Sequence, residues 1–365
     1  MNLLTWAKAI EKKTNALVIE PKLCTRLISP KSTCRQCVDY CPTNCITFTK
    51  DTIEVSDSCL ECSICTTVCP TSALSSNRPS LQQLVQTVLH TCKENEHVYF
   101  HCHKHPIKEE GVAAVAVPCL GSIPREAWLS FLEECDNLTV YLPDGGCVDC
   151  VIKQGEQVWK RELTAGETMS GKRLVVVSDV KQSRGMDELD QRKRLLFYSV
   201  WSEWRAVHKL AVKETLGTGE IKTYQEKLKN DGASLIRKEW TEAANGVMEK
   251  VFNESTYPYQ AKRNLFLDQV RKNKDLQAGK NVRLPMILSD CTLCGACSIL
   301  CPTDALIQET INGVTQIKLN QKNCVDCKLC EEICYFQQIK LIEKENRELL
   351  RERGRETVLF ERKDK

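Results

Sequence analysis

The chain has 365 residues, 42% of them hydrophobic and 27% charged, with a formal net charge of +3 and 23 cysteines. No apolar run reaches the roughly 18 residues that span a bilayer, and charged residues interrupt the start of the chain where an export signal needs an apolar core, so we expect a cytoplasmic protein without a membrane span. Disulfide frameworks belong to short secreted chains, and the cysteines are therefore expected to bind metal or iron–sulfur clusters.

The first cysteine group, between residues 24 and 69, follows a strand-like segment at residues 16–19. Its second half, residues 59–70, reads C-x2-C-x2-C-x3-C-P. With this spacing three thiolates can wrap one face of a [4Fe–4S] cubane, while the fourth cysteine points toward a neighbouring cluster. The run therefore predicts a pair of clusters.

The first half of this group lacks its leading cysteine, because Lys31 stands where that ligand is expected. We predict that Cys24 takes its place and that residues 25–33 loop out. The two ligand sets are then Cys24, Cys34, Cys37 and Cys69 for the first cluster, and Cys41, Cys59, Cys62 and Cys65 for the second.

The middle group follows an α/β pattern, with strands expected at residues 97–102, 112–119 and 138–142 and a helix from Pro124. Because the carboxyl ends of parallel strands meet at one edge, four cysteines can meet there as a thiolate site. They are Cys102, Cys119, Cys147 and Cys150.

This middle segment resembles the [2Fe–2S] delta subunit of methanogen hydrogenases in its Val-Pro-Cys119-Leu-Gly and Gly-Gly-Cys147 pieces. Four readings stay open: a fifth centre holding [2Fe–2S] or zinc, reduced structural thiols, a redox-active Cys147/Cys150 dithiol, or a metal held by alternating histidines on one strand face. Those histidines are His101, His103 and His105. Cys45 and Cys135 are expected to pack in apolar cores.

Residues 181–283 contain no cysteine and show helical periodicity, notably at 187–212 and 261–274. Segments 191–197 and 260–266 resemble each other, each a basic turn before an apolar face. We expect them to be helix starts that pack within the protein or dock onto a partner.

The last cysteine group again contains two runs, the first complete with Pro302 and the second followed by Tyr335 in place of proline. The same crossover predicts two further ligand sets. They are Cys291, Cys294, Cys297 and Cys334 for a third cluster, and Cys301, Cys324, Cys327 and Cys330 for a fourth.

Residues 16–75 and 284–343 resemble bacterial two-cluster ferredoxins in these runs. The resemblance implies a compact α+β module with pseudo-twofold symmetry, two [4Fe–4S] clusters and an electron-carrying role. Two such modules in one chain resemble polyferredoxins and the iron–sulfur subunits of anaerobic oxidoreductase complexes, which implies anaerobic metabolism.

Other chemistries fit the spacing less well. Structural zinc uses two separated cysteine pairs, and radical chemistry on S-adenosylmethionine uses C-x3-C-x2-C, which no run shows. Neither G-x-G-x-x-G nor a phosphate-binding loop occurs. Acidic residues interleave the basic stretch at 192–209, so nucleic-acid binding is not expected.

The predicted fold class is α+β, with two ferredoxin-like dicluster modules flanking a small α/β domain and a helical connector. The expected divisions are residues 1–80, 81–180, 181–283, 284–343 and a charged helical tail at 344–365. The expected function is electron transfer to or from a partner oxidoreductase, a soluble ferredoxin or a flavoprotein. The alternative is an oxidoreductase whose central cysteines are catalytic and are fed by the clusters.

Overall fold

The computed structural model describes residues 17–77, 79–109, 111–180, 261–350 and 356–363. All of them belong to one compact unit, which comprises residues 1–184 together with 258–365. A second unit, residues 185–257, lies outside the described residues, and so do the helices predicted at 187–212 and the basic segment at 191–197. No described helix combines the length and apolar character that crossing a bilayer requires.

The N-terminal segment forms two short antiparallel ladders with helices between them. Strand β1 (Leu17–Ile19) pairs with β4 (Leu74–Ser76), and β2 (Ile46–Phe48) pairs with β3 (Ile53–Val55). The helical elements are η1 (Pro21–Leu23), α2 (Thr25–Ile28), α3 (Gln36–Asp39) and α4 (Ile64–Val68). Because the outer ladder joins the two ends of the segment, it brings the cysteine at residue 24 near the one at residue 69.

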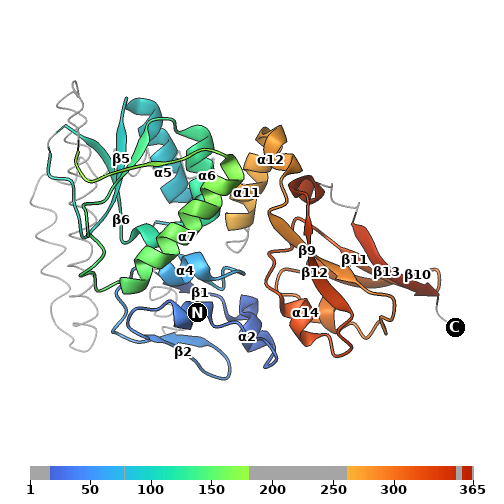
Figure 1. The fold of residues 1–365 in the computed structure, drawn as a ribbon. Coiled ribbons are helices and arrows are strands. Elements are labelled where there is room, and N and C mark those ends of the chain that lie inside the picture. The colour runs from blue at the N-terminus through green and yellow to red at the C-terminus, as the bar shows by residue number, and fades with distance from the viewer. Residues whose placement is uncertain (1–16, 78, 110, 181–260, 351–355, 364–365) are drawn as a thin grey trace, which may run out of the picture. The chain divides into compact units, whose positions relative to one another are not determined.

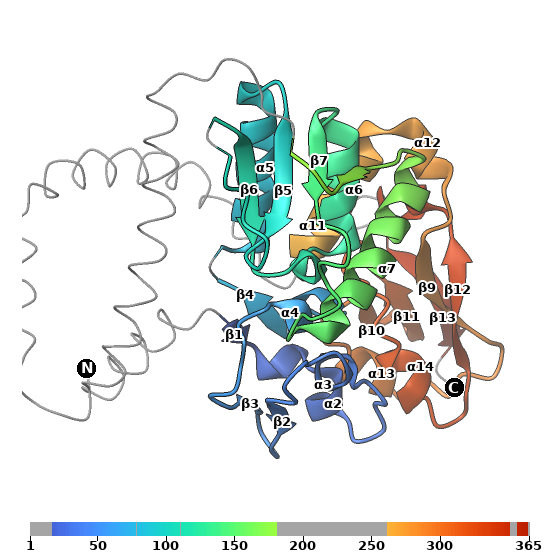
Figure 2. The ribbon, with the colours of Figure 1, turned by 60° about the vertical axis from the view of Figure 1, so that its left-hand side comes forward.

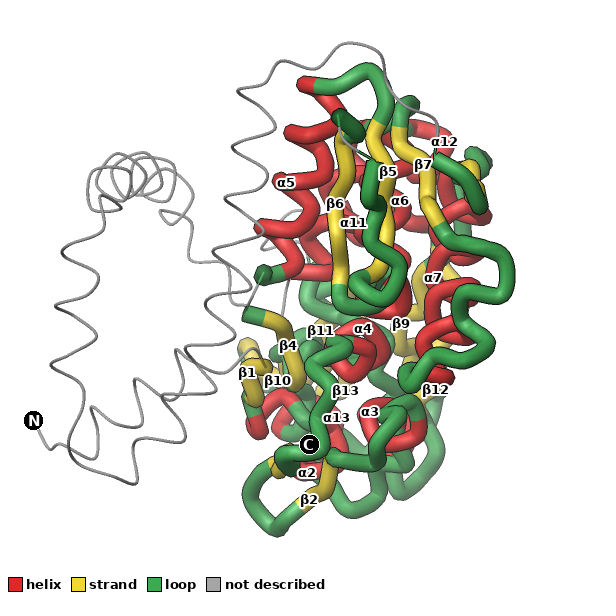
Figure 3. Tube along the Cα trace, turned by 90° about the vertical axis from the view of Figure 1, so that its left-hand side faces the viewer, coloured by secondary structure: helices red, strands yellow, loops and turns green. Residues whose placement is uncertain are grey.

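The central segment is built on a parallel sheet in the order β6-β5-β7-β8, as the strand pattern predicted. Its strands are β5 (Val98–Cys102), β6 (Ala113–Val117), β7 (Leu138–Tyr141) and β8 (Val175–Val177). Helices α5 (Leu81–Glu94), α6 (Arg125–Glu134) and α7 (Lys153–Ser170) accompany it, with the short turn η2 (Leu120–Ser122) after β6 (Figures 1 and 3).

Aromatic side chains fill the core between this sheet and α6. Trp128 and Phe131 are fully buried and lie edge-on to each other, with ring centroids 5.9 Å apart, and Trp128 stands edge-on to Phe100 at 5.6 Å. A capping box fixes the start of α5, where Ser80 and Gln83 exchange hydrogen bonds. The sheet edge that carries the central cysteines is therefore held by a rigid core.

Helix α11 (Ala261–Lys272) packs against α6 and is followed by α12 (Lys274–Ala278). Phe266, Leu267 and Val270 form its buried face together with Leu129 of α6. This helix is the described part of the predicted helical connector, which ends before residue 283 because strand β9 begins at Val282.

The C-terminal segment repeats the N-terminal order of elements. Strand β9 (Val282–Ile287) pairs with β12 (Ile339–Lys344), and β10 (Leu306–Ile311) pairs with β11 (Val314–Leu319), all antiparallel. The cysteine-bearing helices are α13 (Ala296–Ile299) and α14 (Leu329–Ile333). Figure 2 shows them beside α2 and α3 of the N-terminal segment.

The predicted helical tail at residues 344–365 is wrong. The chain forms a 3-10 turn, η4 (Asn346–Leu350), and then strand β13 (Thr357–Lys363), which pairs antiparallel with β11. The run Thr357-Val358-Leu359-Phe360 favours a strand, and the free edge of β11 supplies its partner.

Candidate iron–sulfur sites

The three complete C-x2-C-x2-C runs share one backbone path. In each run the third and fifth residues have positive φ angles between 51° and 76°. These residues are Glu61 and Ser63, Leu293 and Gly295, and Asp326 and Lys328. Left-handed residues turn successive N–H groups inward, and such a concavity holds anionic groups. The N–H groups of Glu61 and Leu293 donate to Cys59 Sγ and Cys291 Sγ, each at 3.4 Å.

The fourth cysteines of all four runs lie in a common turn. The residue three positions later has positive φ in each case and donates its N–H to the cysteine carbonyl. The pairs are Cys41 with Asn44, Cys69 with Ser72, Cys301 with Asp304, and Cys334 with Gln337. The turn at Cys334 forms with Tyr335 in place of proline, and it has the same second bond as the turn with Pro302: the N–H of Gln338 donates to Cys334 Sγ at 3.2 Å and that of Ala305 to Cys301 Sγ at 3.3 Å.

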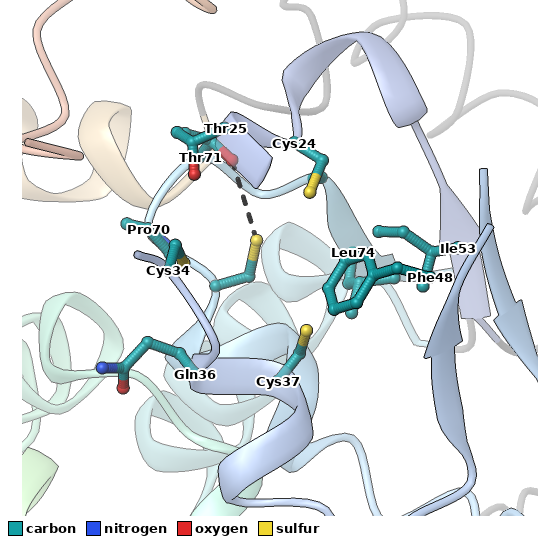
Figure 4. Close-up of a pocket in the computed structure, with 12 residues that line it drawn as sticks. Cys24, Thr25, Cys34, Gln36, Cys37, Phe48, Ile53, Pro70, Thr71 and Leu74 are labelled. Atoms are coloured by element: carbon teal, nitrogen blue, oxygen red, sulfur yellow. Dashed lines mark hydrogen bonds between the residues drawn. The ribbon is translucent and has the colours of Figure 1, made fainter. Parts of the chain in front are cut away.

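The structure brings together the four cysteines predicted for the first cluster. They line one pocket of about 330 Å³, open solvent at its mouth included, whose walls are apolar. In Figure 4 the sulfurs of Cys24 and Cys37 point into this pocket, and Phe48, Ile53 and Leu74 form its far wall. Burial raises the pKa of Cys37 to about 12, and the neighbouring thiols Cys69, Cys34 and Cys24 add to the shift.

Cys24 reaches this pocket without an open loop. It stands at the start of α2, so residues 25–28 form a helical turn where we expected the whole insert to loop out. The hydroxyl of Ser32 donates to Thr25 Oγ1 at 3.0 Å, and both residues are buried. This local packing holds the insert against the pocket and leaves Cys24 only 8% exposed.

The second predicted set, Cys41, Cys59, Cys62 and Cys65, is also gathered. Burial raises the pKa of Cys62 to about 11, with the thiols of Cys59 and Cys41 as its neighbours. Burial also raises the pKa of Cys65, where Cys62, Cys59, Cys37 and Cys41 contribute. Because Cys37 belongs to the first set, the two sets lie next to each other.

In the C-terminal segment, the cysteines of each of the two predicted sets also lie near one another. Burial raises the pKa of Cys297 to about 12, and the thiols of Cys291, Cys294 and Cys334 lie around it. Burial raises the pKa of Cys330 further, with Cys324, Cys327, Cys301 and then Cys297 as neighbours. The crossed partners Cys334 and Cys301 thus each lie with the other run, as in the N-terminal segment.

The chemistry of these donor sets fits a [4Fe–4S] cubane better than a single ion. A tetrahedral zinc with Zn–S bonds near 2.3 Å needs thiolates roughly 4 Å apart. Among the residues that the structure describes, no three His, Cys, Asp or Glu side chains are gathered closely enough to hold one metal ion. Each predicted set contains at least one buried thiol, and its other thiols are buried, partly exposed or exposed. Backbone N–H groups donate to several of these sulfurs, as a cubane requires.

Lys262 and Arg263 lie beside these sets. The sequence predicts them only as part of a basic helix start. Lys262 Nζ donates to the carbonyls of Thr66, Thr67 and Cys69 at 2.5, 2.8 and 2.9 Å. Arg263 donates to the carbonyl of Cys324. The segment at 260–266 therefore packs within the protein, and its basic residues contact the backbone of two predicted ligands.

The four central cysteines lie near one another at the carboxyl edge of the parallel sheet. Burial raises the pKa of Cys119 to about 12, with Cys62, Cys102 and Cys150 as neighbouring thiols. Burial also raises the pKa of Cys147, beside Glu156, Cys102 and Cys150. All four are partly exposed.

The three histidines do not lie along one strand, because strand β5 ends at Cys102 and the following residues turn. His101 is buried and its Nδ1 lies 3.1 Å from the carbonyl of Cys102, whereas His105 Nε2 lies 2.8 Å from the carbonyl of Gly146. His105 therefore contacts the loop that carries Cys147, whereas His101 contacts the end of its own strand.

The packing cysteines are buried as expected. Cys45 is 4% exposed, and its Sγ lies 3.4 Å from Cys41 Sγ. Cys135 is also buried and shares a thiol–thiol hydrogen bond with Cys92, which raises the pKa of Cys135. Cys45 thus lies against a predicted ligand without being needed in either set.

Residues 286–335 match the family model described as a 4Fe-4S dicluster domain. The match spans all eight cysteines of the C-terminal runs, so this segment is a ferredoxin-like iron–sulfur module. With its many cysteines, the match supports an iron–sulfur, electron-transfer role for the chain. No curated protein and no solved structure matches the chain.

Proposed function

We propose that this protein is an electron carrier holding four [4Fe–4S] clusters, two in each ferredoxin-like segment. The observation that carries the proposal is the gathering of the sixteen cysteines into four crossed sets, each with three ligands from one run and one from its partner run. Each cluster accepts and releases one electron when bound. Every set supplies four thiolates, which leaves no iron free for substrate.

We propose the same four ligand sets that the cysteine spacing predicts. Cys24, Cys34, Cys37 and Cys69 line the pocket of Figure 4. We assign Cys41, Cys59, Cys62 and Cys65 to the second cluster, Cys291, Cys294, Cys297 and Cys334 to the third, and Cys301, Cys324, Cys327 and Cys330 to the fourth. Their partner would be a redox protein, such as a catalytic oxidoreductase subunit, a soluble ferredoxin or a flavoprotein, with which the clusters exchange electrons.

Metal analysis of the anaerobically purified full chain tests the cluster number. We expect about 16 iron and 16 acid-labile sulfide per chain, no zinc, and [4Fe–4S] signals in the electron paramagnetic resonance (EPR) spectrum after dithionite reduction. A value near 8 iron would restrict the clusters to one segment. Zinc in place of iron would contradict the proposal.

Cys24 provides the sharpest test of the ligand sets, because it replaces the leading cysteine that the first run lacks. Cys24→Ser should lower the iron content by up to about 4 atoms per chain, or convert that cluster to a three-iron form. Cys45→Ser is the matched control, since Cys45 is buried beside Cys41 but is not assigned to a set. Equal iron loss in both variants would contradict the assignment of Cys24.

A fifth centre at Cys102, Cys119, Cys147 and Cys150 is a second proposal, with [2Fe–2S] ahead of zinc. The N–H of Gly121 donates to Cys119 Sγ at 3.4 Å, two residues on, as at the leading cysteines Cys59 and Cys291. Cys119 also packs with Cys62 of the second set. About 18 iron per chain with a [2Fe–2S] signal, lost in Cys119→Ser, would support this centre, and 16 iron without zinc in both proteins would contradict it.

The alternative, a catalytic central site fed by the clusters, makes a different prediction. It requires a substrate-dependent turnover that Cys119→Ser abolishes while about 16 iron remain bound. If the fifth centre only transfers electrons, Cys119→Ser should instead remove the spectrum of that centre and have no other effect.

A further inference from the structure

The first turn of α11 connects the two ferredoxin-like segments through the adjacent residues Lys262 and Arg263. Lys262 is partly buried, and its three N–H donors meet the three carbonyls of Thr66, Thr67 and Cys69 at the end of α4. An ammonium group has three donors, so this arrangement satisfies all of them. Its positive charge therefore lies within electrostatic reach of the thiol of Cys69.

Arg263 points to the other segment, as expected for adjacent residues that are separated by about 100° around a helix. Its guanidinium donates to the carbonyl of Cys324 and lies within electrostatic reach of that thiol. Glu126 faces both cations, and Asp326 faces Arg263. Each cation thus contacts the backbone of one predicted ligand, one in each segment.

The two segments also touch directly beside the same ligand sets. The N–H and hydroxyl of Thr33, next to Cys34, donate to the carboxylate of Glu332 at 3.2 and 2.5 Å. Glu332 lies on α14, which also carries Cys330. Figure 2 shows α14 beside the N-terminal helices. Glu332 stands between Cys330 of the fourth set and Cys334 of the third, so this contact does not choose between them. The first turn of α11 does, because it contacts the backbone of Cys69 and of Cys324.

We propose that Lys262 and Arg263 are positioning residues that raise the reduction potentials of the clusters that Cys69 and Cys324 would hold. The inference rests on the proposed function. A cubane with four thiolates becomes more negative by one charge on reduction, so a fixed positive charge close to a ligand stabilises the reduced form. Lys262 raises the potential of the cluster at Cys24, Cys34, Cys37 and Cys69, and Arg263 that of the cluster at Cys301, Cys324, Cys327 and Cys330.

An EPR-monitored redox titration of the full chain tests this, with iron content measured on each sample. Lys262→Met should shift one cluster to a lower midpoint potential, and Arg263→Met should shift a different one. Both substitutions keep much of the aliphatic side chain. Lys262→Arg and Arg263→Lys keep the charge and should restore the potentials, which a merely structural role would not predict.

Arg271→Met is the matched control, because Arg271 lies on the same helix, is exposed and pairs only locally with Asp268. It removes the same charge and should leave every potential unchanged. The inference fails if Lys262→Met and Arg263→Met titrate like the control, or if the charge-keeping variants shift as far as the methionine variants. A wild-type chain without iron would instead contradict the proposed function itself.

Discussion

At the scale of single residues, Glu162 is a buried charge with two cationic partners, and it is only 3% exposed. Arg125 grips it with two side-chain N–H groups at 2.8 and 2.9 Å, and Arg161 donates at 2.9 Å. Although burial opposes ionisation, the bonds and charges of Arg125 and Arg161 lower the pKa of Glu162 below its ordinary value. Arg161 also donates a hydrogen bond to the hydroxyl of Tyr40. The contact between Arg161 and Tyr40 therefore links the central segment to the N-terminal segment.

We expect Arg125→Met to lower the free energy of unfolding by about 2–3 kcal/mol at pH 7, because it leaves a buried carboxylate with one cationic partner, Arg161. The loss of stability stays small because Arg161 still pairs with Glu162 and because Arg125 is partly exposed. Urea unfolding under anaerobic conditions, followed by tryptophan fluorescence, measures it. Arg271→Met, on an exposed pair, should cost less than about 0.5 kcal/mol.

The pH dependence of this variant follows from the lowered pKa. In the wild type, the stability that ionised Glu162 contributes to the folded state is complete above the unfolded pKa of 4.5. It is lost only as the pH falls through the lower folded pKa. In Arg125→Met burial dominates and the folded pKa rises. The difference in free energy of unfolding between the wild type and Arg125→Met should therefore become smaller as the pH falls from 7 to 5. A difference that does not change with pH would contradict this account.

At the scale of elements, the ligand loops depend on left-handed residues at fixed positions. Gly295, with a φ angle of 76°, corresponds to Ser63 and Lys328 in the other complete runs. An added Cβ at Gly295 would meet no atom closer than 3.4 Å, so the constraint there is the backbone angle and not space. Small or straight side chains tolerate this angle better than β-branched ones.

Gly295→Val should therefore release the cluster held by Cys291, Cys294, Cys297 and Cys334, with a loss of about 4 iron per chain. Gly295→Ser copies the residue at position 63 and should keep its iron. Gly313→Val is the control, because Gly313 has a φ angle of 71° in the turn between β10 and β11, away from any ligand. Equal iron in all three variants would contradict the role of the loop angle.

The turn before strand β13 is a second element with a structural role. Leu349 is fully buried in the core cluster of the C-terminal segment. Leu349→Ala should lower the free energy of unfolding by about 2–5 kcal/mol, since it leaves a cavity. Val358→Ala, at a position 44% exposed on the neighbouring strand, should cost less than about 1 kcal/mol in the same urea experiment. Similar values for both would indicate that the tail does not complete the core.

At the scale of the whole molecule, cluster binding should reverse the sign of the net charge. The chain alone carries +3, and each set of four thiolates around a core of charge +2 adds −2, so four clusters give about −5. The iron-loaded protein should bind an anion exchanger at pH 7 more strongly than the same chain after iron is removed. Identical elution would contradict binding through four thiolates per cluster.

The sequence by itself determined the sixteen candidate ligands, because cubane-binding loops are local and their spacing is visible within about twelve residues. It also determined the parallel central sheet, whose strands appear as short apolar runs. The charges of the tail predict a helix, whereas the run at residues 357–360 favours the strand that the structure shows. A strand is decided by its partner, here β11, which lies about forty residues earlier.

Only the tertiary structure decided which features meet across long separations in sequence. Lys262 contacts the carbonyl of Cys69, and Thr33 contacts Glu332, almost two hundred and three hundred residues apart. Cys119 packs with Cys62 in the same way. Spacing rules describe a loop closing on itself, whereas these contacts arise from how helices and modules pack, and no local pattern encodes that packing.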